Sequence, residues 1–269
     1  MRRATKTHLS HCHAQHLQHP ATNMSPRIDS FHATETQQSL CDCRVIGLMN
    51  STEVFGHERA NMEVFKALRA LGAEVTIGIN TLDSGGLVRE LLHEQNFETF
   101  SIPWGCHWSK KFFRRSPSLF PSNLSRVVRC SKIVGQQVSV RRATHIHVGT
   151  PLVYSFVAPL LWKNRSLKLV YRMGDEPPIG STPNLMIWKS CIRRANRIVA
   201  NSEFVRSSIQ SVVGTGKPVD LIYNTAPRHD LSADVDTESI NVRSKECRFL
   251  YVGQIAAHKG VGELVQAAI

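Results

Sequence analysis

The chain has 269 residues, a hydrophobic content of 42% and a formal net charge of +12, a composition that supports a folded core. Its longest apolar run, residues 148–162, contains two prolines and falls short of the roughly 20 apolar residues that span a bilayer, so we expect no transmembrane helix. Seven cysteines without framework spacing argue against a secreted disulfide scaffold and favour a reducing, cytoplasmic location.

Residues 1–43 differ from the rest of the chain. They are polar, lack apolar periodicity and hold six of the thirteen histidines. The apolar segment of a secretory signal is missing, and we interpret this stretch as a disordered, His-rich tail. The alternative is a metal site in "HLSHCHAQHLQH", since His and Cys are common metal ligands, but no second ligand cluster completes it.

Beyond this tail, strand signals alternate with helix signals. Apolar residues from Val64 to Leu71 recur at the spacing of one helix face, and Gly72 is a typical residue to end that helix. Further helices are predicted over residues 124–142 and 203–213. The predicted strands cover residues 44–49, 74–79, 97–102, 145–149, 168–173, 197–201 and 219–224.

The order of these elements indicates the fold. The helix over residues 203–213 has a favourable N-cap in Ser202 and a terminating glycine in Gly214. Strands that alternate with helices imply an α/β fold with a Rossmann-like, doubly wound parallel sheet. Ligands bind such sheets beyond the carboxyl ends of the strands. The loops that follow residues 49, 149, 173, 201 and 224 are therefore candidate ligand loops.

Three segments resemble a known family. They are "FGHERANMEVFKALRALGAEVTI", "RRANRIVANSEFVRSSIQSVVGTGKPVDLIYNTAP" and "FLYVGQIAAHKGVGELVQAAI". In order and spacing they are similar to the first loop and helix, the "NSEF" strand–helix unit and the second-domain opening of the group 1 glycosyltransferases with the GT-B fold. The likeness covers residues 44–269 and is strongest after Arg193.

The resemblance implies a domain organisation. Residues 44–228 are expected to form the N-terminal, acceptor-binding domain, and residues 229–247 a linker. Residues 248–269 then match the first strand and helix of the C-terminal, donor-binding domain. The remainder of that domain, with its two glutamates eight positions apart, has no counterpart in this sequence. We therefore interpret the chain as a truncated glycosyltransferase.

The resemblance also implies a reaction. Group 1 enzymes transfer a sugar from a nucleotide-sugar donor to a saccharide or lipid-linked acceptor, with retention of configuration. They need no metal in the active site and no cofactor. Lys and backbone N–H groups stabilise the departing diphosphate. The alternative is a catalytically inactive basic module that is derived from the acceptor domain and binds a membrane surface or nucleic acid.

The implied donor contacts lie near the end of the chain. In "VGQIAAHKG", Gly253 would let the backbone approach a diphosphate, and Lys259 would supply a positive charge. Gln254 stands where the family usually has Arg, and it completes the donor-binding candidates. The alternative is a strand-to-helix turn with a solvated Lys259.

The implied acceptor contacts lie in the first domain. "YRMGDEPP" has Gly174 and Asp175 where many members have a His–Asp pair, so Asp175 is the catalytic candidate. The alternative for Asp175 is a turn-capping role before Pro177. For Ser202 the alternative is the N-cap described above. The acceptor-binding candidates are Gly56, His57, Glu58, Arg59 and Ser202.

The basic charge is unevenly distributed. Between Glu98 and Asp175 there is no acidic residue, whereas the same window holds thirteen Lys or Arg. Aromatic residues interleave with these cations, and this mixture suits either an anionic membrane surface or nucleic acid, with a solvated basic loop as the third reading. The resemblance favours the membrane, because many members of the family act on lipid-linked acceptors. We expect a peripheral location at the inner face of the membrane. The membrane-contact candidates are Lys110, Lys111, Phe112, Phe113, Arg114 and Arg115, flanked by Trp104 and Trp108.

Overall fold

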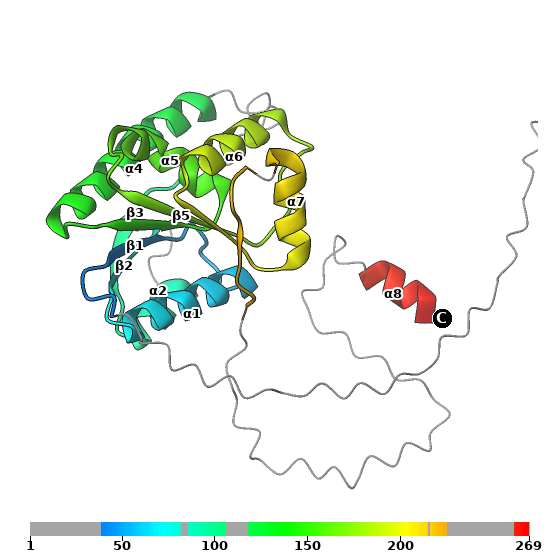
Figure 1. The fold of residues 1–269 in the computed structure, drawn as a ribbon, viewed down its shortest axis with the longest axis horizontal. Coiled ribbons are helices and arrows are strands. Elements are labelled where there is room, and N and C mark those ends of the chain that lie inside the picture. The colour runs from blue at the N-terminus through cyan, green and yellow to red at the C-terminus, as the bar shows by residue number, and fades with distance from the viewer. Residues whose placement is uncertain (1–38, 82–85, 106–117, 215, 225–260, 269) are drawn as a thin grey trace, which may run out of the picture.

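The computed structural model describes residues 39–81, 86–105, 118–214, 216–224 and 261–268 (Figure 1). Within this part of the chain, strands and helices alternate as the sequence predicts. The strands are β1 Arg44–Leu48, β2 Glu74–Asn80, β3 Glu98–Ile102, β4 His145–Val148, β5 Lys168–Met173, β6 Arg197–Ala200 and β7 Asp220–Leu221. The helices are α1 Gly56–Ala70, α2 Leu87–Glu94, α4 Leu119–Val140, α5 Pro151–Lys163, α6 Thr182–Arg194, α7 Glu203–Val213 and α8 Val261–Ala268.

The described strands form one parallel sheet in the order β3-β2-β1-β4-β5-β6-β7. The chain winds outward from β1 in one direction to β3 and then, starting from β4, in the other direction to β7. The strand order therefore reverses between β1 and β4, where Leu48 pairs with Val148. This doubly wound, Rossmann-like α/β topology is the one predicted from the sequence, and its switch point lies between the carboxyl ends of β1 and β4.

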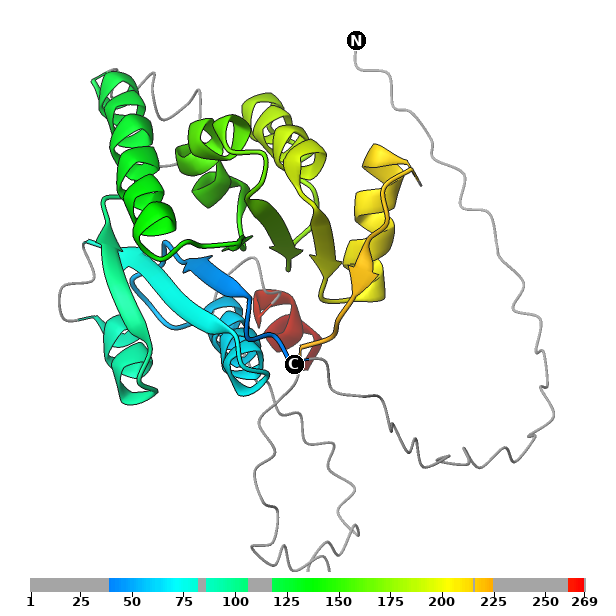
Figure 2. The ribbon, with the colours of Figure 1, turned by 60° about the vertical axis from the view of Figure 1, so that its left-hand side comes forward.

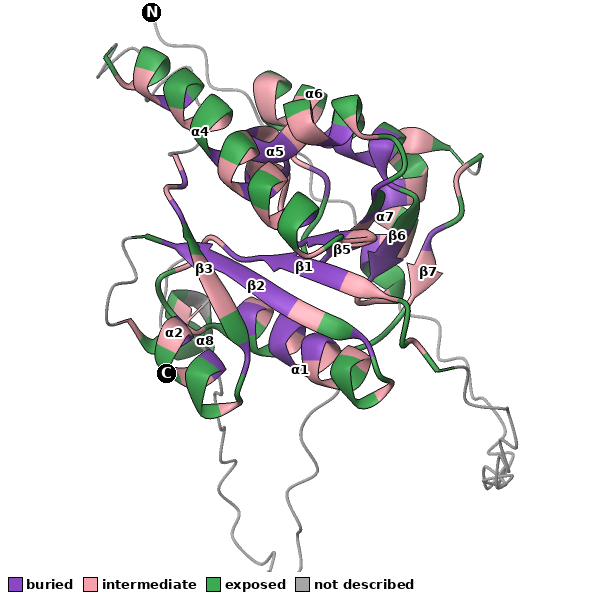
Figure 3. Ribbon diagram, turned by 90° about the vertical axis from the view of Figure 1, so that its left-hand side faces the viewer, coloured by how far each residue is buried: buried purple, intermediate pink, exposed green. Residues whose placement is uncertain are grey.

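Helices cover the two faces of the sheet unequally. Figure 3 shows α1 and α2 on one side and α4, α5 and α6 on the other, with buried residues on the inner surfaces. Figure 2 shows the same division from another direction. Along β5, Leu169, Tyr171 and Met173 belong to the large core under α4 to α6, while Val170 and Arg172 lie on the opposite face. The alternation follows from the two-residue period of a strand.

Several helix ends have a clear local cause. Gly72, which follows the Leu71 C-cap of α1, has a φ of +95°, and Gly214, the C-cap of α7, has a φ of +74°. Glycine adopts this region without steric cost. The Ser202 hydroxyl accepts a hydrogen bond from the Val205 N–H at 3.2 Å, which confirms it as the N-cap of α7. The Thr150 hydroxyl does the same for α5 at Val153, also at 3.2 Å.

The apolar run that spans residues 148–162 is explained by burial. It forms most of α5, which packs between α4 and α6 and whose buried side chains include Tyr154, Phe156 and Leu161. In the part of the chain that the structure describes, no helix combines the length and the hydropathy needed to cross a bilayer.

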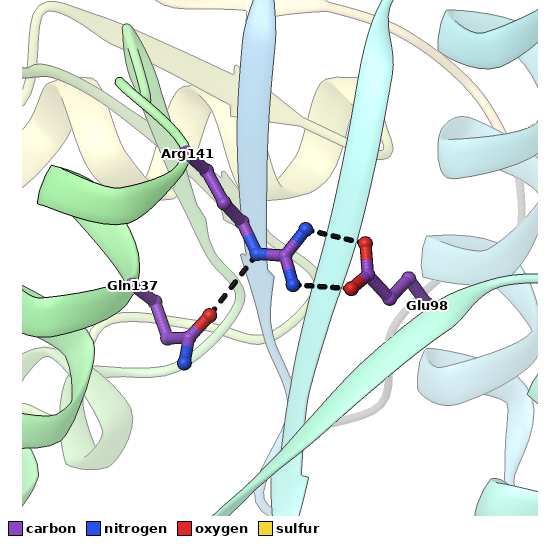
Figure 4. Close-up of polar contacts among 3 residues, drawn as sticks. All are labelled: Glu98, Gln137 and Arg141. Atoms are coloured by element: carbon purple, nitrogen blue, oxygen red, sulfur yellow. Dashed lines mark hydrogen bonds and ion pairs between the residues drawn. The ribbon is translucent and has the colours of Figure 1, made fainter.

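The long helix α4 is joined to the edge strand β3 by a polar cluster at the amino-terminal end of the strand. Figure 4 shows the guanidinium of Arg141 paired side by side with the carboxylate of Glu98, while its Nε donates to Gln137 Oε1 at 3.0 Å. This hydrogen bonding lowers the pKa of Glu98. Because the Glu98 side chain is 60% exposed, the pair contributes little stability.

One prediction from the sequence is wrong. Trp104 was expected to flank a membrane-facing stretch, but it is only 3% exposed. Its indole Nε1 donates to the Met49 carbonyl at 2.8 Å, and its ring meets Phe156 edge-on. Trp104 is therefore a core residue with a satisfied polar atom. Residues 107–117, including the other membrane-contact candidates, lie outside the described residues.

Candidate active site

A cavity of about 310 Å³ opens at the carboxyl ends of β4 and β5, next to the switch point of the sheet. This is the edge at which the sequence predicts ligand loops. Its wall is formed by the loops after β1, β4 and β5 and by the first turns of α5 and α6. The lining residues are Asn50, Gly149, Thr150, Pro151, Leu152, Tyr171, Met173, Gly174, Asp175, Glu176, Pro178, Asn184 and Ile187.

The chemistry of this wall is mixed. Tyr171 and Met173 are buried residues of β5 and give the cavity an apolar floor. Amide, hydroxyl and carboxylate groups from Asn50, Thr150, Asn184, Asp175 and Glu176 provide hydrogen-bond partners of both kinds. An apolar floor with a few convergent polar groups is typical of a small-molecule site. The set suits a ligand that carries several hydroxyl groups.

His57 lies in a narrow polar niche that shares Asn50, Gly149 and Thr150 with this cavity. A Cβ atom on Gly149 would stand 2.5 Å from His57 Nε2, so the imidazole occupies the space that any side chain at position 149 would need. The Nδ1 edge of the ring lies toward Gly174, where an added Cβ would be 3.7 Å away. The imidazole is therefore held between the ends of β4 and β5.

Two further polar side chains connect His57 to the sheet. Asn61 Nδ2 lies 3.1 Å from His57 Nε2, and Asn61 Oδ1 accepts from Arg172 Nη1 at 3.3 Å. The other terminal nitrogen of Arg172 donates to Asn224 Oδ1. Asn61 and Arg172 are only 2% and 4% exposed. A chain of hydrogen bonds thus runs from β5 through α1 to the niche.

Burial lowers the pKa of His57. The charge of Arg172 acts in the same direction, whereas Glu58 and Asp175 oppose it by favouring the protonated ring. The net result is a pKa below the ordinary value of 6.5, so His57 is neutral at physiological pH. Its neighbour His147 is fully buried on β4, and burial together with the Arg172 charge lowers the pKa of His147 to about 3.

The structure brings some of the predicted site residues together and leaves others apart. Asp175 lines the cavity, and His57 and Glu58 line the adjoining niche. Glu58 also accepts from the Phe55 N–H at 3.2 Å, so it helps to begin α1. Gly56 and Arg59 are exposed on the first turn of the same helix. Gly253, Gln254 and Lys259 lie outside the described residues, and so do Lys110 to Arg115.

The sequence analysis did not single out five residues that the structure places at or beside the site. Two of them lie in expected ligand loops, because Asn50 and Thr150 directly follow positions 49 and 149. Arg172 interrupts an apolar strand, which marks it as unusual. Asn61 precedes Phe65 by one helical turn and so lies on the buried face of α1. The fifth, Asn184, had no signal in its spacing.

A second cavity, also of about 310 Å³, lies on the other face of the sheet, beside α1. Its lining is almost wholly apolar and includes Val45, Leu68, Val170 and Val199. Its polar contributors are the histidines of β4 and Arg172. Within the described part of the chain, neither ring nitrogen of His147 has a hydrogen-bond partner, and the same holds for Arg172 Nε.

The sequence profile of Glycosyltransferase Family 4 matches residues 54–227, more than half of the chain, and the chain therefore belongs to this family. The family resemblance expected from the sequence is confirmed. No curated protein sequence matches the chain.

Solved structures support the fold. Sucrose-phosphate synthase from Thermosynechococcus elongatus superposes with a TM-score of 0.53 at 11% identity, over 67% of this chain and 48% of that one. MurG from Acinetobacter baumannii gives 0.45 at 12% identity, over 70% and 47%. A glycosyltransferase from Rickettsia africae gives 0.45 at 16%, over 67% and 42%. The chain thus spans about half the length of these proteins. The superposition on sucrose-phosphate synthase supports its Rossmann-like fold.

Proposed function

We propose that this chain is the acceptor-binding part of a glycosyltransferase. In this proposal a sugar passes from a nucleotide-sugar donor to a saccharide or lipid-linked acceptor with retention of configuration, and no metal or cofactor takes part. The observation that carries the proposal is the hydroxyl-matching cavity at the switch point of a Glycosyltransferase Family 4 domain. Parallel sheets bind ligands at this position because the diverging loops leave a crevice there.

The described residues supply the acceptor half of the chemistry. Asp175 is exposed at the cavity wall, and its carboxylate can accept a hydrogen bond from an acceptor hydroxyl. Asn50, Thr150 and Asn184 would orient the neighbouring hydroxyl groups. We assign the donor contacts to Gly253, Gln254 and Lys259, where the Lys259 ammonium would stabilise charge on the departing diphosphate. Gly56, Arg59 and Ser202 remain further candidates for acceptor contacts.

Acceptor binding can be tested on the chain itself. Methyl NMR spectra should show shifts for Met173, Leu152 and Ile187, which line the cavity, when mono- and oligosaccharides are titrated. Methyl groups of Val88 and Leu92, in the separate core under α1 and α2, should not shift. Asp175→Asn should weaken the interaction, whereas Asp220→Asn, on the edge strand β7, should not. If no saccharide shifts the cavity methyls, acceptor binding is contradicted.

Transfer is a separate test. We expect the 269-residue chain alone to show no turnover with any nucleotide sugar, because it spans about half the length of the solved glycosyltransferases. Supplying a matching donor domain should restore transfer, and Lys259→Ala should then weaken donor use. Losing a hydrogen bond to a charged group typically costs about 1.5–3 kcal/mol. Turnover by the chain alone would contradict this division of roles.

A second candidate function is membrane or nucleic-acid binding by a catalytically inactive basic module. The acid-free window with its thirteen cations favours it. Some of these cations have internal roles, since Arg126 donates to the Trp104 carbonyl, Arg141 pairs with Glu98, and Arg172 is buried. The proposal rests on the basic and aromatic residues from Lys110 to Arg115, which lie outside the described part of the chain. Each cation near an anionic surface contributes about 1 kcal/mol.

Liposome cosedimentation distinguishes the surfaces. Anionic vesicles should bind the chain and neutral vesicles should not, and the binding should fall as salt screens the charges. Changing Lys110, Lys111, Arg114 and Arg115 together to Ser should abolish it. Equal binding to both kinds of vesicle, or no loss in the variant, removes the membrane proposal. Preferential binding of single-stranded nucleic acid in a parallel titration would favour the other surface.

A further inference from the structure

The hydrogen bonds around His57 determine which of its ring nitrogens carries the proton. A neutral imidazole has one nitrogen that donates and one that accepts, and heavy-atom positions alone do not distinguish them. In this structure, however, the contact of His57 is the end of a chain that begins at an arginine. Because an arginine guanidinium has donors and no acceptor, the direction of every bond in the chain follows from it.

The first bond orients Asn61. Arg172 Nη1 lies 3.3 Å from Asn61 Oδ1, and only the amide oxygen can face the guanidinium as an acceptor. Rotating the amide by 180° would place its NH₂ group against the guanidinium, so that two donors would face each other in a buried setting. Asn61 is 2% exposed, so water offers no alternative partner there.

The second bond follows from the first. With Oδ1 directed to Arg172, Asn61 presents Nδ2 to His57 Nε2 at 3.1 Å. An amide NH₂ only donates, so Nε2 must accept and carries no proton. A neutral ring with an unprotonated Nε2 has its proton on Nδ1. A doubly protonated ring would have no acceptor for Asn61, which adds to the reasons why His57 stays neutral.

We propose that Arg172 and Asn61 are positioning residues that hold His57 as a neutral imidazole with its proton on Nδ1, a fixed hydrogen-bond donor at the edge of the cavity. The Nδ1 edge lies toward Gly174, which lines the cavity beside Asp175. The His57 side chain is half-buried, in the niche that shares Asn50, Gly149 and Thr150 with the cavity.

The charged groups around the ring are consistent with this assignment. Arg172 comes from β5, Glu58 from the first turn of α1 and Asp175 from the loop after β5, and each interacts electrostatically with His57. His147, on β4, is uncharged at neutral pH because its pKa lies near 3. Burial and these charges together lower the pKa of His57. A lowered pKa favours the neutral ring, and only a neutral ring can accept a hydrogen bond at Nε2.

The assignment defines what His57 can do for a ligand. With Nδ1 protonated and Nε2 occupied by Asn61, the ring has no free lone pair and cannot serve as a general base. It can donate one hydrogen bond to an oxygen atom, such as a hydroxyl or ring oxygen, while Asp175 nearby can accept one. The identity of that oxygen as part of a saccharide acceptor rests on the proposed function, whereas the proton position does not.

The proton position is measured directly by two-bond ¹H–¹⁵N correlation spectra of the chain with ¹⁵N-labelled histidines. The His57 signals are assigned as those that disappear in His57→Gln. We expect Nε2 to show the shift of an unprotonated nitrogen and Nδ1 that of a protonated one at pH 7. In Asn61→Asp, the carboxylate can accept from both Arg172 and His57, so the proton should move to Nε2 and the pattern should reverse.

Two controls isolate the effect. His93, exposed on α2, should be unchanged in every variant. Asn196→Asp introduces the same charge at a side chain whose Oδ1 accepts from Leu169 and Arg194, and it should leave His57 unchanged. Because the spectra need no ligand, their outcome is independent of saccharide binding. A protonated Nε2 in the wild type overturns the proposal, and so does an unchanged pattern in a folded Asn61→Asp chain; if that variant does not fold, the wild-type spectrum decides.

Discussion

The ring of His147 meets the ring of Phe65 edge-on, with 5.1 Å between their centroids, in the interior between β4 and α1. Phe65 is fully buried and His147 is 3% exposed, yet among the described residues neither nitrogen of the histidine has a hydrogen-bond partner. A buried polar atom without a partner costs about 1–3 kcal/mol. His147 is therefore a destabilising residue in an otherwise apolar contact.

Replacing this histidine should stabilise the domain. His147→Leu removes both unpartnered nitrogens while keeping a similar volume, and we expect the free energy of unfolding at pH 7 to rise by about 1 kcal/mol. The matched control is His145→Leu on the same strand, because His145 Nδ1 lies 2.8 Å from the Thr144 hydroxyl and this bond would be lost. Urea unfolding compares the three chains. A clear loss of stability in His147→Leu would indicate that the ring has a partner.

His147 should also make stability depend on pH. Its folded pKa of about 3 lies below the ordinary value of 6.5, so between these values the unfolded chain binds a proton that the folded chain does not. The lowered pKa therefore has no effect on stability above pH 6.5. As the pH falls from 6.5 toward 3, it lowers the free energy of unfolding by up to about 1.4 kcal/mol per pH unit. Between pH 7 and pH 4, the free energy of unfolding should fall less steeply with pH in His147→Leu than in the wild type. Parallel curves would contradict the lowered pKa.

Gly149 should be intolerant of a side chain for reasons of space. In Gly149→Ala the new Cβ would stand 2.5 Å from His57 Nε2, which forces the imidazole away from Asn61. Overpacking of this kind typically costs about 1–3 kcal/mol. Gly180→Ala is the control, since none of the described residues lies within 4 Å of a Cβ there. Thermal unfolding gives the stability, and the His57 ring signals should move only in the first variant. Unchanged signals would show that the niche is wider than described.

Arg194 should be important for folding although it is far from the cavity. Its guanidinium is buried at the end of α6 and donates to the carbonyls of Leu161, Asn164 and Leu167, at 2.7, 3.0 and 2.7 Å. Arg194→Met leaves these acceptors unpaired and should lower the free energy of unfolding by about 3 kcal/mol. Arg193→Met, at the exposed neighbouring position, should change it by less than about 0.5 kcal/mol. Similar losses in both variants would contradict the structural role.

The sequence by itself determined the fold class, the order of the strands along the chain and the helices α1, α4 and α7. Strand and helix signals depend on the chemistry of neighbouring residues, such as the apolar spacing from Val64 to Leu71 and the glycines that follow α1 and α7, and neighbours are visible in a sequence. The ends of the elements differ from the prediction. Helix α4 begins five residues before its predicted start, and β7 is two residues long where a strand over residues 219–224 was predicted. Caps such as Ser202 were predictable because they act within a single turn.

The tertiary structure alone decided which distant residues meet. Asn61 and Arg172 are 111 residues apart, and no local pattern predicts that one orients the other. Trp104 illustrates the same limit, because an indole next to a basic stretch suggests a membrane surface until the Met49 carbonyl is found as its partner. Hydrogen bonds between strands and helices depend on sheet order and register, which arise from packing of the whole chain. The sequence therefore indicated the edge of the sheet where the site lies, and the fold decided which side chains meet there.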